Sequence, residues 1–380
     1  MSQKTNILHV LNARGGVDVY VRYLCQFLPE NEYDIKVVRS IYDGEKKFKN
    51  NLGEDLEEYR IPMVREISLF NDLKSLLALI KIIKKAKPDI IHCHSAKGGV
   101  IGRLAALFLN IPVIYTPHAF SYLSTESSIK EKIYLTIEKW LKIKKGKGML
   151  LACAKTEATR AINDLNYNPG IVRAWPNSIP KIKTSKPSTE IIEIENPYAC
   201  TIGRPSYQKN LSLMVDAIKL VVDEIPKFQF IIMGIGHYSP EVTNLKKKID
   251  KLGLTNNITL VDWTDREHIL DILSGSMFFV STSRYEGLPY SLLESMVLGK
   301  PAVASNVDGN SDLIVNGENG LLFDLNDVQT LAHQIIKLNN DVELREKLGK
   351  AAKNSISENN SLPQNINSIK DVYSSVLNLA

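Results

Sequence analysis

The sequence of 380 residues is long enough for two or three domains, at roughly 150 residues per domain. Its 44% hydrophobic and 23% charged residues exclude the intrinsically disordered and collagen-like classes. The net charge of +5 is too small to indicate a nucleic-acid partner, but it hides a division along the chain. Residues 1–180 carry 27 basic and 18 acidic side chains, whereas residues 181–380 carry 20 and 24.

The cysteines and the hydropathy of the sequence indicate the cellular compartment of the protein. The four cysteines lie far apart with no C-x-x-C pair, which predicts buried free thiols in a reducing compartment. No apolar run reaches the roughly 18–20 residues of a membrane span, and the first apolar stretch, 7–11, is too short for the core of a signal peptide. We therefore expect a cytoplasmic protein.

In the first half, short apolar runs alternate with helical patterns. This alternation is typical of a doubly wound α/β domain with a mostly parallel sheet. The predicted strands are 7–11, 35–38, 89–93, 113–116 and 149–154, and the predicted helices are 18–28, 72–85, 98–109 and 129–144.

The same alternation restarts after a polar, proline-containing segment. We expect an N-terminal domain over 1–178, a linker over 179–197, a second domain over 198–360 and a C-terminal helix within 361–380 that packs on either domain. Ligands of open parallel sheets bind beyond the carboxyl ends of the strands, so a cleft between the two sheets is the expected site. Strands are predicted at 198–202, 228–233, 258–261, 277–280 and 302–304, and helices at 211–222, 241–252, 268–274, 290–298 and 328–338.

The segment after the predicted strand 277–280 carries two glutamates. A loop, 286–289, leads from the strand end into a helix, whose unpaired N–H groups suit a phosphate. Glu294 lies in that helix among apolar neighbours, so burial of its carboxylate requires a polar partner. Sugar hydroxyls are one candidate partner, and a lysine or solvent is the other.

Cations and glycines follow other predicted strands. Arg204 comes directly after Gly203 at a strand end, and Lys209 precedes a helix. Such a pair can neutralise a diphosphate, although surface cations are more often merely solvated. Gly15 and Gly16 follow the first strand, where they permit either a close approach to a ligand or a plain turn.

Histidines lie at the ends of two predicted strands. His118 follows the strand 113–116, where either a structural or a ligand-binding role fits. His92 and His94 share one strand face, but there is no second ligand pair at metal-like spacing, so we expect no metal site.

Several catalytic signatures are missing. The sequence has no P-loop and no G-x-S-x-G, and the glycine pair that includes Gly234 lacks the third glycine of a dinucleotide fingerprint. No D-x-D motif occurs, which argues against a diphosphate site built on a divalent metal. A site made of Arg, Lys and a helix end fits better.

In combination, these segments resemble the retaining glycosyltransferases of family 4, which have the two-domain GT-B fold. Glu286 and Glu294 match the family's E-x7-E signature within EGLPYSLLESMVLGKPAVAS, and GRPSYQKN resembles its Gly-Arg…Lys motif. PDIIHCHSAKGGVIGRLAA, TPHAF, WPNSI and GNSDLIVNGENGLLF resemble further family segments, so the similarity extends over roughly residues 6–350. The resemblance implies two Rossmann-like α/β domains that face each other across a cleft.

The resemblance also implies a role for each matching residue. Arg204 and Lys209 would stabilise the leaving nucleoside diphosphate. Glu286 would contact the donor sugar and His118 would lie near the reacting centre, which completes the implied catalytic set. The implied donor-binding residues are Gly15, Gly16, Gly203, Gly234, Gly287, Leu288, Pro289, Tyr290 and Glu294.

The implied reaction moves a sugar with retention from a nucleotide-sugar, expected to be a UDP-sugar, to a hydroxyl group. The acceptor would be a glycan or a lipid-diphosphate-linked oligosaccharide of a surface polysaccharide. Neither metal nor cofactor is implied. Lysine clusters at 81–87 and 142–147 suit an anionic membrane, which would place the protein peripherally at the inner face of the cytoplasmic membrane. Solvated helix faces explain the clusters equally well.

Two other interpretations stay open at this point. Sugar-nucleotide 2-epimerases share the two-domain fold, but they are not expected to carry the pair EGLPYSLLE and GRPSYQKN. A catalytically silent scaffold is the other alternative. Turnover of the donor without an acceptor distinguishes the epimerase.

Overall fold

The computed structural model describes residues 4–12, 15–44, 46–64, 66–182, 197–236, 239 and 241–378. The chain divides into two units: unit 1 comprises residues 1–177 together with 362–380, and unit 2 comprises 178–361. Most of the segment expected to be a linker, 183–196, lies outside the described residues.

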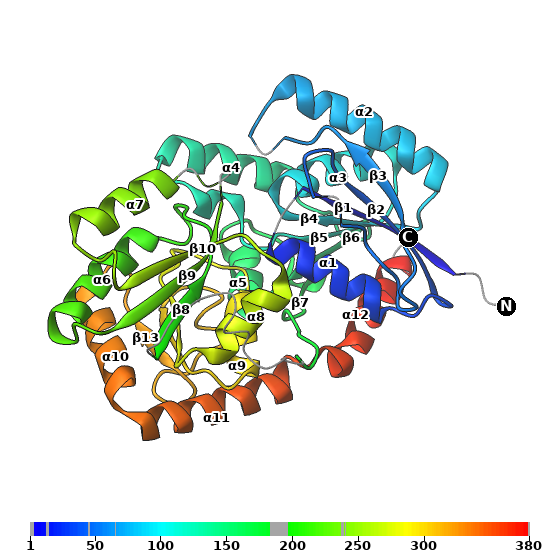
Figure 1. Ribbon diagram of the computed structural model, residues 1–380. Helices are drawn as coiled ribbons and strands as arrows, with labels where there is room; N and C mark the ends of the chain where they lie inside the picture. Colours follow the sequence, from blue (N-terminus) through cyan, green and yellow to red (C-terminus); the bar gives the residue numbers. More distant parts are fainter. Residues whose placement is uncertain are drawn as a thin grey trace. The chain divides into compact units, whose positions relative to one another are not determined.

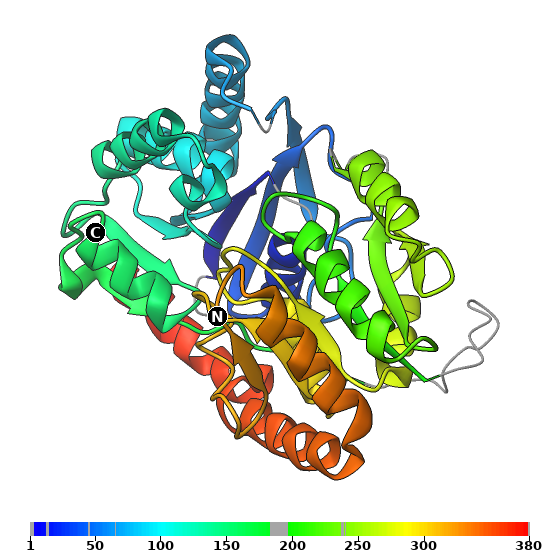
Figure 2. The same cartoon turned by 90° about the vertical axis from the view of Figure 1, so that its left-hand side faces the viewer.

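Unit 1 is built on a parallel seven-stranded sheet with the order β3-β2-β1-β4-β5-β6-β7. Figures 1 and 2 show α2 and α3 on one face of this sheet and α1 with α12 on the other. Glycines on α3 let it lie directly on the sheet, since an added Cβ at Gly102 would stand 2.2 Å from the Cys93 sulfur. The strands are β1 (Thr5–Leu11), β2 (Tyr33–Ser40), β3 (Glu57–Ile61), β4 (Ile90–His94), β5 (Val113–Thr116), β6 (Gly148–Ala152) and β7 (Val172–Ala174). The α-helices are α1 (Gly16–Phe27), α2 (Leu69–Ala86), α3 (Ser95–Leu109), α4 (Ser128–Trp140), α5 (Lys155–Asn163) and α12 (Leu362–Leu377).

Unit 2 has a parallel six-stranded sheet with the order β10-β9-β8-β11-β12-β13. Its core is formed by apolar side chains of the inner strands and of α6 and α10. The strands are β8 (Tyr198–Ile202), β9 (Gln229–Ile235), β10 (Ile258–Asp262), β11 (Phe279–Ser281), β12 (Ala302–Ser305) and β13 (Leu321–Phe323). The helices are α6 (Leu211–Glu224), α7 (Val242–Lys251), α8 (Arg266–Gly275), α9 (Tyr290–Val297), α10 (Val328–Asn340) and α11 (Val342–Asn359).

The predicted fold class is confirmed, because both units are α/β with parallel sheets. Each sheet also has a point at which the strand order reverses: between β1 and β4 in unit 1, and between β8 and β11 in unit 2. Ligands of open α/β sheets bind at such switch points. The four cysteines are free and buried, as predicted.

One predicted helix is too long. The helix expected over 129–144 ends at Trp140, where the C-cap Leu141 leaves the helical conformation, and the chain then turns at Gly146, with φ +82°, before β6. The lysines at 142–147 therefore lie in a loop and not on a helix face.

Candidate functional site

Two loops meet at the switch point of unit 2. One follows β8 and leads through Gly203 and Arg204 to α6, and the other follows β11. The hydroxyl group of Thr282 donates to the carbonyl oxygen of Lys209 at 2.9 Å, and the amide of Arg284 donates to the carbonyl oxygen of Gln208 at 2.8 Å. These two hydrogen bonds hold the two loops together, although the bonded residues are more than 70 positions apart in the sequence.

Glu286 is at the centre of this site. Its carboxylate is buried, and it accepts hydrogen bonds from Lys209 Nζ at 2.7 Å, Ser283 Oγ at 2.7 Å and Gln208 Nε2 at 3.2 Å. The side chain of Lys209 is 21% exposed to solvent. The absence of a side chain at Gly203 leaves room for that lysine, since an added Cβ would lie 3.0 Å from its methylene groups. The structure therefore brings together Gly203, Lys209 and Glu286, and holds an accessible cation over a buried carboxylate.

The loop after Glu286 leads into α9. Leu288 and Tyr290 are buried, and Pro289 is the N-cap residue of the helix. Gly309 lies against this loop with φ +78°, and an added Cβ there would stand 2.8 Å from the Gly287 carbonyl oxygen. Its amide donates to Asp312 Oδ2 at 3.0 Å. The approach of a second backbone thus fixes the loop that precedes the helix N-terminus.

Glu294, in the second turn of α9, is also buried, and its partner is Arg266 at the start of α8. Burial raises the pKa of the Glu294 carboxyl, and the nearby Arg266 guanidinium opposes that rise. The sequence required a polar partner for this carboxylate, and the structure supplies an arginine.

Replacing Arg266 with alanine should destabilise the protein in a pH-dependent way. Without the guanidinium, burial acts unopposed and the pKa of Glu294 rises further. A raised pKa in the folded state lowers stability as pH increases, because the carboxyl ionises less readily in the folded protein than in the unfolded chain. In urea titrations, the difference from the parent should be small near about pH 4 and grow toward about pH 7.

The control is Lys219→Ala, which removes the cation of a more exposed ion pair with Asp223. Exposed pairs contribute about 0–1 kcal/mol, so this variant should show little change across the same pH range. An Arg266→Ala difference that shrinks toward neutral pH would contradict the assignment.

The remaining candidates in unit 2 lie near the same switch point. Gly234, at the end of β9, has φ +95°, and an added Cβ would stand 3.5 Å from the backbone of Gly203. Arg204 directly follows Gly203 in the loop after β8. Sequence reasoning assigned no role to Gln208, Ser283, Arg266 or Gly309, although Gln208 and Gly309 lie within the quoted segments GRPSYQKN and GNSDLIVNGENGLLF.

The other three candidates lie in unit 1. Gly15 is the N-cap residue of α1, and Gly16 begins that helix. His118 follows β5, and both it and Ala119 have positive φ, at 54° and 74°. The Glu157 carboxylate stabilises this loop by accepting from the Ala119 amide at 2.6 Å. Strained backbone of this kind clusters at functional sites.

Both ring nitrogens of His118 face partners within unit 1. Nδ1 lies 3.2 Å from the Cys153 sulfur, and Nε2 lies 3.2 Å from His94 Nδ1. His94 Nε2 in turn lies 2.9 Å from His9 Nδ1. Burial lowers the pKa of His118 and of His9 to about 3, so the imidazoles are neutral at physiological pH.

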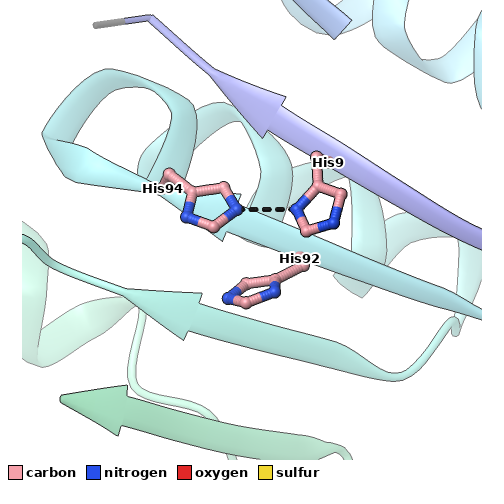
Figure 3. Close-up of side chains that lie close together, drawn as sticks. All are labelled: His9, His92 and His94. Atoms are coloured by element: carbon pink, nitrogen blue, oxygen red, sulfur yellow. Dashed lines mark hydrogen bonds between the residues drawn. The ribbon is translucent and has the colours of Figure 1, made fainter. Parts of the chain in front are cut away.

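His9, His92 and His94 gather on one sheet face, as Figure 3 shows. Their ring nitrogens lie within 4.8 Å of one another, a spacing that suits a metal ion. Sequence reasoning placed only His92 and His94 together, and His9 joins them because β1 pairs with β4. Hydrogen bonds also account for the cluster, since His92 contacts the hydroxyl groups of Tyr373 at 3.0 Å and Thr116 at 2.9 Å.

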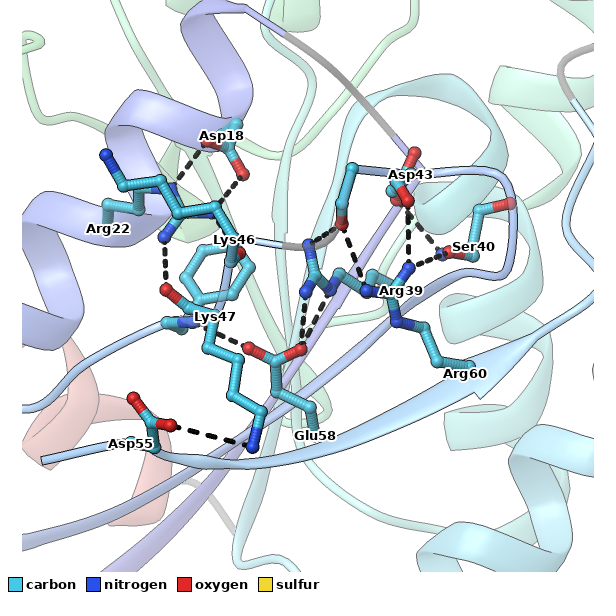
Figure 4. Close-up of polar contacts among 12 residues, drawn as sticks. Asp18, Arg22, Arg39, Ser40, Asp43, Lys46, Lys47, Asp55, Glu58 and Arg60 are labelled. Carbon is cyan, nitrogen blue, oxygen red and sulfur yellow. Dashed lines mark hydrogen bonds and ion pairs between the residues drawn. The ribbon is translucent and has the colours of Figure 1, made fainter. Parts of the chain in front are cut away.

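Three arginines donate hydrogen bonds to the backbone of the loop that follows β2 in unit 1 (Figure 4). Arg22 donates to the carbonyl oxygens of Lys46 and Lys47, and Arg39 and Arg60 both donate to that of Gly44. Carboxylates complete the network: Asp18 pairs with Arg22, and Glu58 pairs with Arg39. The charges of Arg22 and Arg39 are therefore paired with carboxylates inside this network.

Family models match both units. The model for glycosyl transferases group 1 matches residues 183–355, and the model for Glycosyltransferase Family 4 matches residues 14–181. A relative from Escherichia coli, UDP-Gal:alpha-D-GlcNAc-diphosphoundecaprenol alpha-1,3-galactosyltransferase, is 30% identical, and the alignment covers 97% of each chain. The chain belongs to the GT-B glycosyltransferases.

Two further proteins are similar to this glycosyltransferase over most of its length. The capsular polysaccharide biosynthesis glycosyltransferase CapM of Staphylococcus aureus is 26% identical over 90% of each chain. The structure of HepE from Anabaena in complex with UDP-glucose matches with a TM-score of 0.80 at 19% identity, covering 97% of this chain and 99% of that one. The predicted glycosyltransferase function is confirmed, and neither the epimerase nor the silent scaffold is favoured.

Proposed function

We propose that this glycosyltransferase moves a sugar from a UDP-sugar to a hydroxyl group of a lipid-diphosphate-linked glycan, with retention at the anomeric carbon and without a divalent metal. The observation that carries the proposal is the Lys209–Glu286 pair at the switch point of unit 2. The UDP-glucose complex of HepE and the name of the E. coli relative support the donor and acceptor classes.

The paired charges suit the two ends of a sugar diphosphate. On donor binding, Lys209 and Arg204 face the diphosphate, and the Glu286 carboxylate accepts from hydroxyl groups of the sugar. The N–H groups at the start of α9, from Gly287 to Tyr290, add partial positive charge. Glu294 holds the ribose hydroxyls.

In the reaction, the bond between the anomeric carbon and the phosphate oxygen breaks, and a bond to the acceptor oxygen forms on the same face. The leaving phosphate oxygen takes the acceptor proton, so no separate protein base is needed. Lys209 and Arg204 stabilise the charge that develops on the leaving diphosphate. For unit 1, the proposal assigns contact with the phosphates to Gly15 and Gly16, and a role at the reacting carbon to His118.

The position of the enzyme relative to the membrane is a separate question from its glycosyltransferase activity. In the part of the chain that the structure describes, no helix combines the length and apolarity needed to cross a bilayer. We propose a peripheral position at the inner face of the cytoplasmic membrane, where a lipid-linked acceptor would be presented.

Donor binding should raise the melting temperature. A ligand at about 100 times its Kd stabilises the folded state by about 2.7 kcal/mol. The measurement compares UDP-galactose, UDP-glucose, UDP-N-acetylglucosamine and GDP-mannose in thermal unfolding, followed by assays of UDP release with and without a diphosphoundecaprenol-linked acceptor.

Protection by a UDP-sugar together with acceptor-dependent UDP release is the expected result, and the product linkage should keep the donor's anomeric configuration. Transfer should persist after dialysis against EDTA, with residual zinc measured by mass spectrometry because of the histidine cluster. Loss of transfer that zinc or magnesium restores would overturn metal independence, and donor turnover without acceptor would overturn the assigned reaction.

A further inference from the structure

Glu157 lies in the first turn of α5, and only 3% of its surface is exposed. Its two carboxylate oxygens accept hydrogen bonds from two separate backbone segments. Oε1 accepts from the Ala119 amide at 2.6 Å, and Oε2 accepts from the Cys153 amide at 2.6 Å. Ala119 belongs to the loop after β5, and Cys153 directly follows β6, the neighbouring strand. One buried side chain therefore joins the carboxyl ends of two adjacent strands, at the edge of the sheet where ligands bind.

The loop that Glu157 holds has an unfavourable backbone conformation. His118 and Ala119 are consecutive residues with positive φ, at 54° and 74°, although neither is glycine. This region of φ is unfavourable for residues with a Cβ, so it persists only where the surroundings enforce it. The hydrogen bond from the Ala119 amide to a buried carboxylate is charge-assisted and supplies such a restraint. Without it, the loop can relax to a less strained conformation.

Glu157 also acts on the imidazole of His118, through Cys153. Burial and the Glu157 carboxylate both raise the pKa of the Cys153 thiol, so the thiol stays protonated. The nearby carboxylate attracts the S–H proton, which leaves the lone pairs of the sulfur for other donors. His118 Nδ1 lies 3.2 Å from that sulfur, so Nδ1 is the ring nitrogen that carries the proton.

The rest of the histidine chain agrees with this direction. With the proton on Nδ1, His118 Nε2 accepts from His94 Nδ1 at 3.2 Å. His94 Nε2 then accepts from His9 Nδ1 at 2.9 Å, the bond drawn in Figure 3. The chain ends on a lone pair at His9 Nε2, which is buried and has no hydrogen-bond partner among the described residues. The opposite direction would end on a buried N–H group without an acceptor, which is the more costly arrangement.

We propose that Glu157 is a positioning residue for sugar transfer, which fixes the loop after β5 and, through Cys153, holds His118 as the tautomer protonated on Nδ1. Both ring nitrogens of His118 are then occupied, so the imidazole anchors the loop in one place. A group that is fixed before the donor binds needs no reorganisation during the reaction. This inference rests on the proposed role of His118 at the reacting carbon.

The decisive variant is Glu157→Gln, which keeps the shape of the side chain. Glutamine has one acceptor oxygen, and its NH2 group cannot accept from the second amide, so one of the two backbone hydrogen bonds is lost. The matched control is Glu138→Gln, which changes another buried carboxylate of unit 1. The donors to Glu138 are the side chains of Arg103 and Tyr115, so its replacement leaves both amide bonds of Glu157 intact.

Steady-state kinetics should separate the two variants. The donor is the nucleotide-sugar that best protects the parent in thermal unfolding, and rates are compared at matched folded fractions. We expect Glu157→Gln to lower kcat at least about tenfold, because misplacement of a reacting group by about 1 Å can cost about 10²-fold. The KM for the donor should change less than about twofold, since the proposed nucleotide contacts belong to unit 2. Parental kcat in Glu157→Gln, or an equal loss in Glu138→Gln, would overturn the proposal.

A second substitution tests the restraint on the loop. Glycine adopts positive φ without strain, so Ala119→Gly should let the loop keep its conformation without the carboxylate. In the Glu157→Gln background, Ala119→Gly should raise kcat at least about threefold, whereas in the parent it should change kcat less than about twofold. A double variant no more active than Glu157→Gln would contradict the restraint.

NMR of the full chain with 15N-labelled histidine rings gives a readout that does not depend on activity. The two nitrogens of a neutral imidazole are distinct, so their signals report the tautomer, and His118→Gln identifies the signals of His118. We expect the proton on Nδ1 in the parent and in Glu138→Gln, and a mixture of tautomers in Glu157→Gln. A His118 protonated on Nε2 in the parent would overturn the proposal.

These outcomes separate the inference from the proposed function. A parent without donor protection and without transfer would overturn the function, and the tautomer of His118 would still show whether Glu157 holds the loop. A parent that transfers sugar, together with a Glu157→Gln protein that has parental kcat and an unchanged tautomer, would overturn only the positioning role.

Discussion

Replacing Lys209 with alanine should lower kcat by about 10²- to 10³-fold, the range observed when one preorganised donor to a developing charge is removed. Lys209 Nζ lies 2.7 Å from Glu286 Oε1, so the substitution removes the proposed contact to the leaving diphosphate and also the cation that neutralises a buried carboxylate. The measurement is steady-state release of UDP at saturating donor and acceptor.

A loss of folding must be separated from a loss of catalysis. Without Lys209, the buried Glu286 keeps only uncharged partners, Ser283 and Gln208, which should cost about 1–3 kcal/mol of stability. The double variant Lys209→Met/Glu286→Gln removes both charges, so we expect it to recover most of that stability but none of the activity.

The matched control for Lys209 is Lys248→Ala in the same unit. Lys248 donates to Asp216 at 2.6 Å on a partly exposed surface, where its removal should leave kcat unchanged. Full transfer activity in the Lys209→Ala protein would overturn the assigned role. An inactive Lys209→Ala protein with parental melting temperature would support it most directly.

The second large effect is expected from Gly309→Ala. An added Cβ would stand 2.8 Å from the Gly287 carbonyl oxygen and 2.9 Å from Glu286 Cβ, so the loop before α9 must move. Misplacement of a reacting group by about 1 Å can cost about 10²-fold in rate. We therefore expect kcat/KM to fall at least about tenfold.

Gly317→Ala is a closely matched control. Gly317 has φ +80° against +78° for Gly309, but an added Cβ there meets no described atom within 4 Å. Both variants bear the cost of a left-handed alanine, about 1–2 kcal/mol, and only Gly309→Ala should also displace the loop. Equal kinetic effects of the two substitutions, measured at matched folded fractions, would show that the close approach at Gly309 has no part in catalysis.

The fold was predictable where strands are continuously apolar. β4 and β6 were predicted from short runs of buried residues. β3, by contrast, is an edge strand whose charged residues carry no apolar signal, and two of them, Glu58 and Arg60, take part in the arginine network. α11 was missed because its buried stripe is narrow, with Leu348, Ala352 and Ile356 among polar residues.

The site was predictable as a set of residues but not as a set of contacts. Glu286 and Lys209 were both identified, yet their pairing depends on β8 and β11 being neighbours at the strand-order reversal. That adjacency is a property of the whole sheet and leaves no local trace in the sequence. For the same reason, the sequence did not predict the approach of Gly309 to the loop before α9 or the contact of Arg266 with Glu294.

The division of the chain has a consequence for its synthesis. Unit 2 is one continuous segment, whereas unit 1 needs α12, whose Tyr373 contacts His92 of β4. During translation, unit 2 can therefore complete its fold while unit 1 still lacks the helix that covers its histidines. Domains generally fold in the order in which they emerge. Here the first unit to begin is the last to finish, so a nascent chain arrested before residue 362 should expose the His92 face to chaperones and proteases.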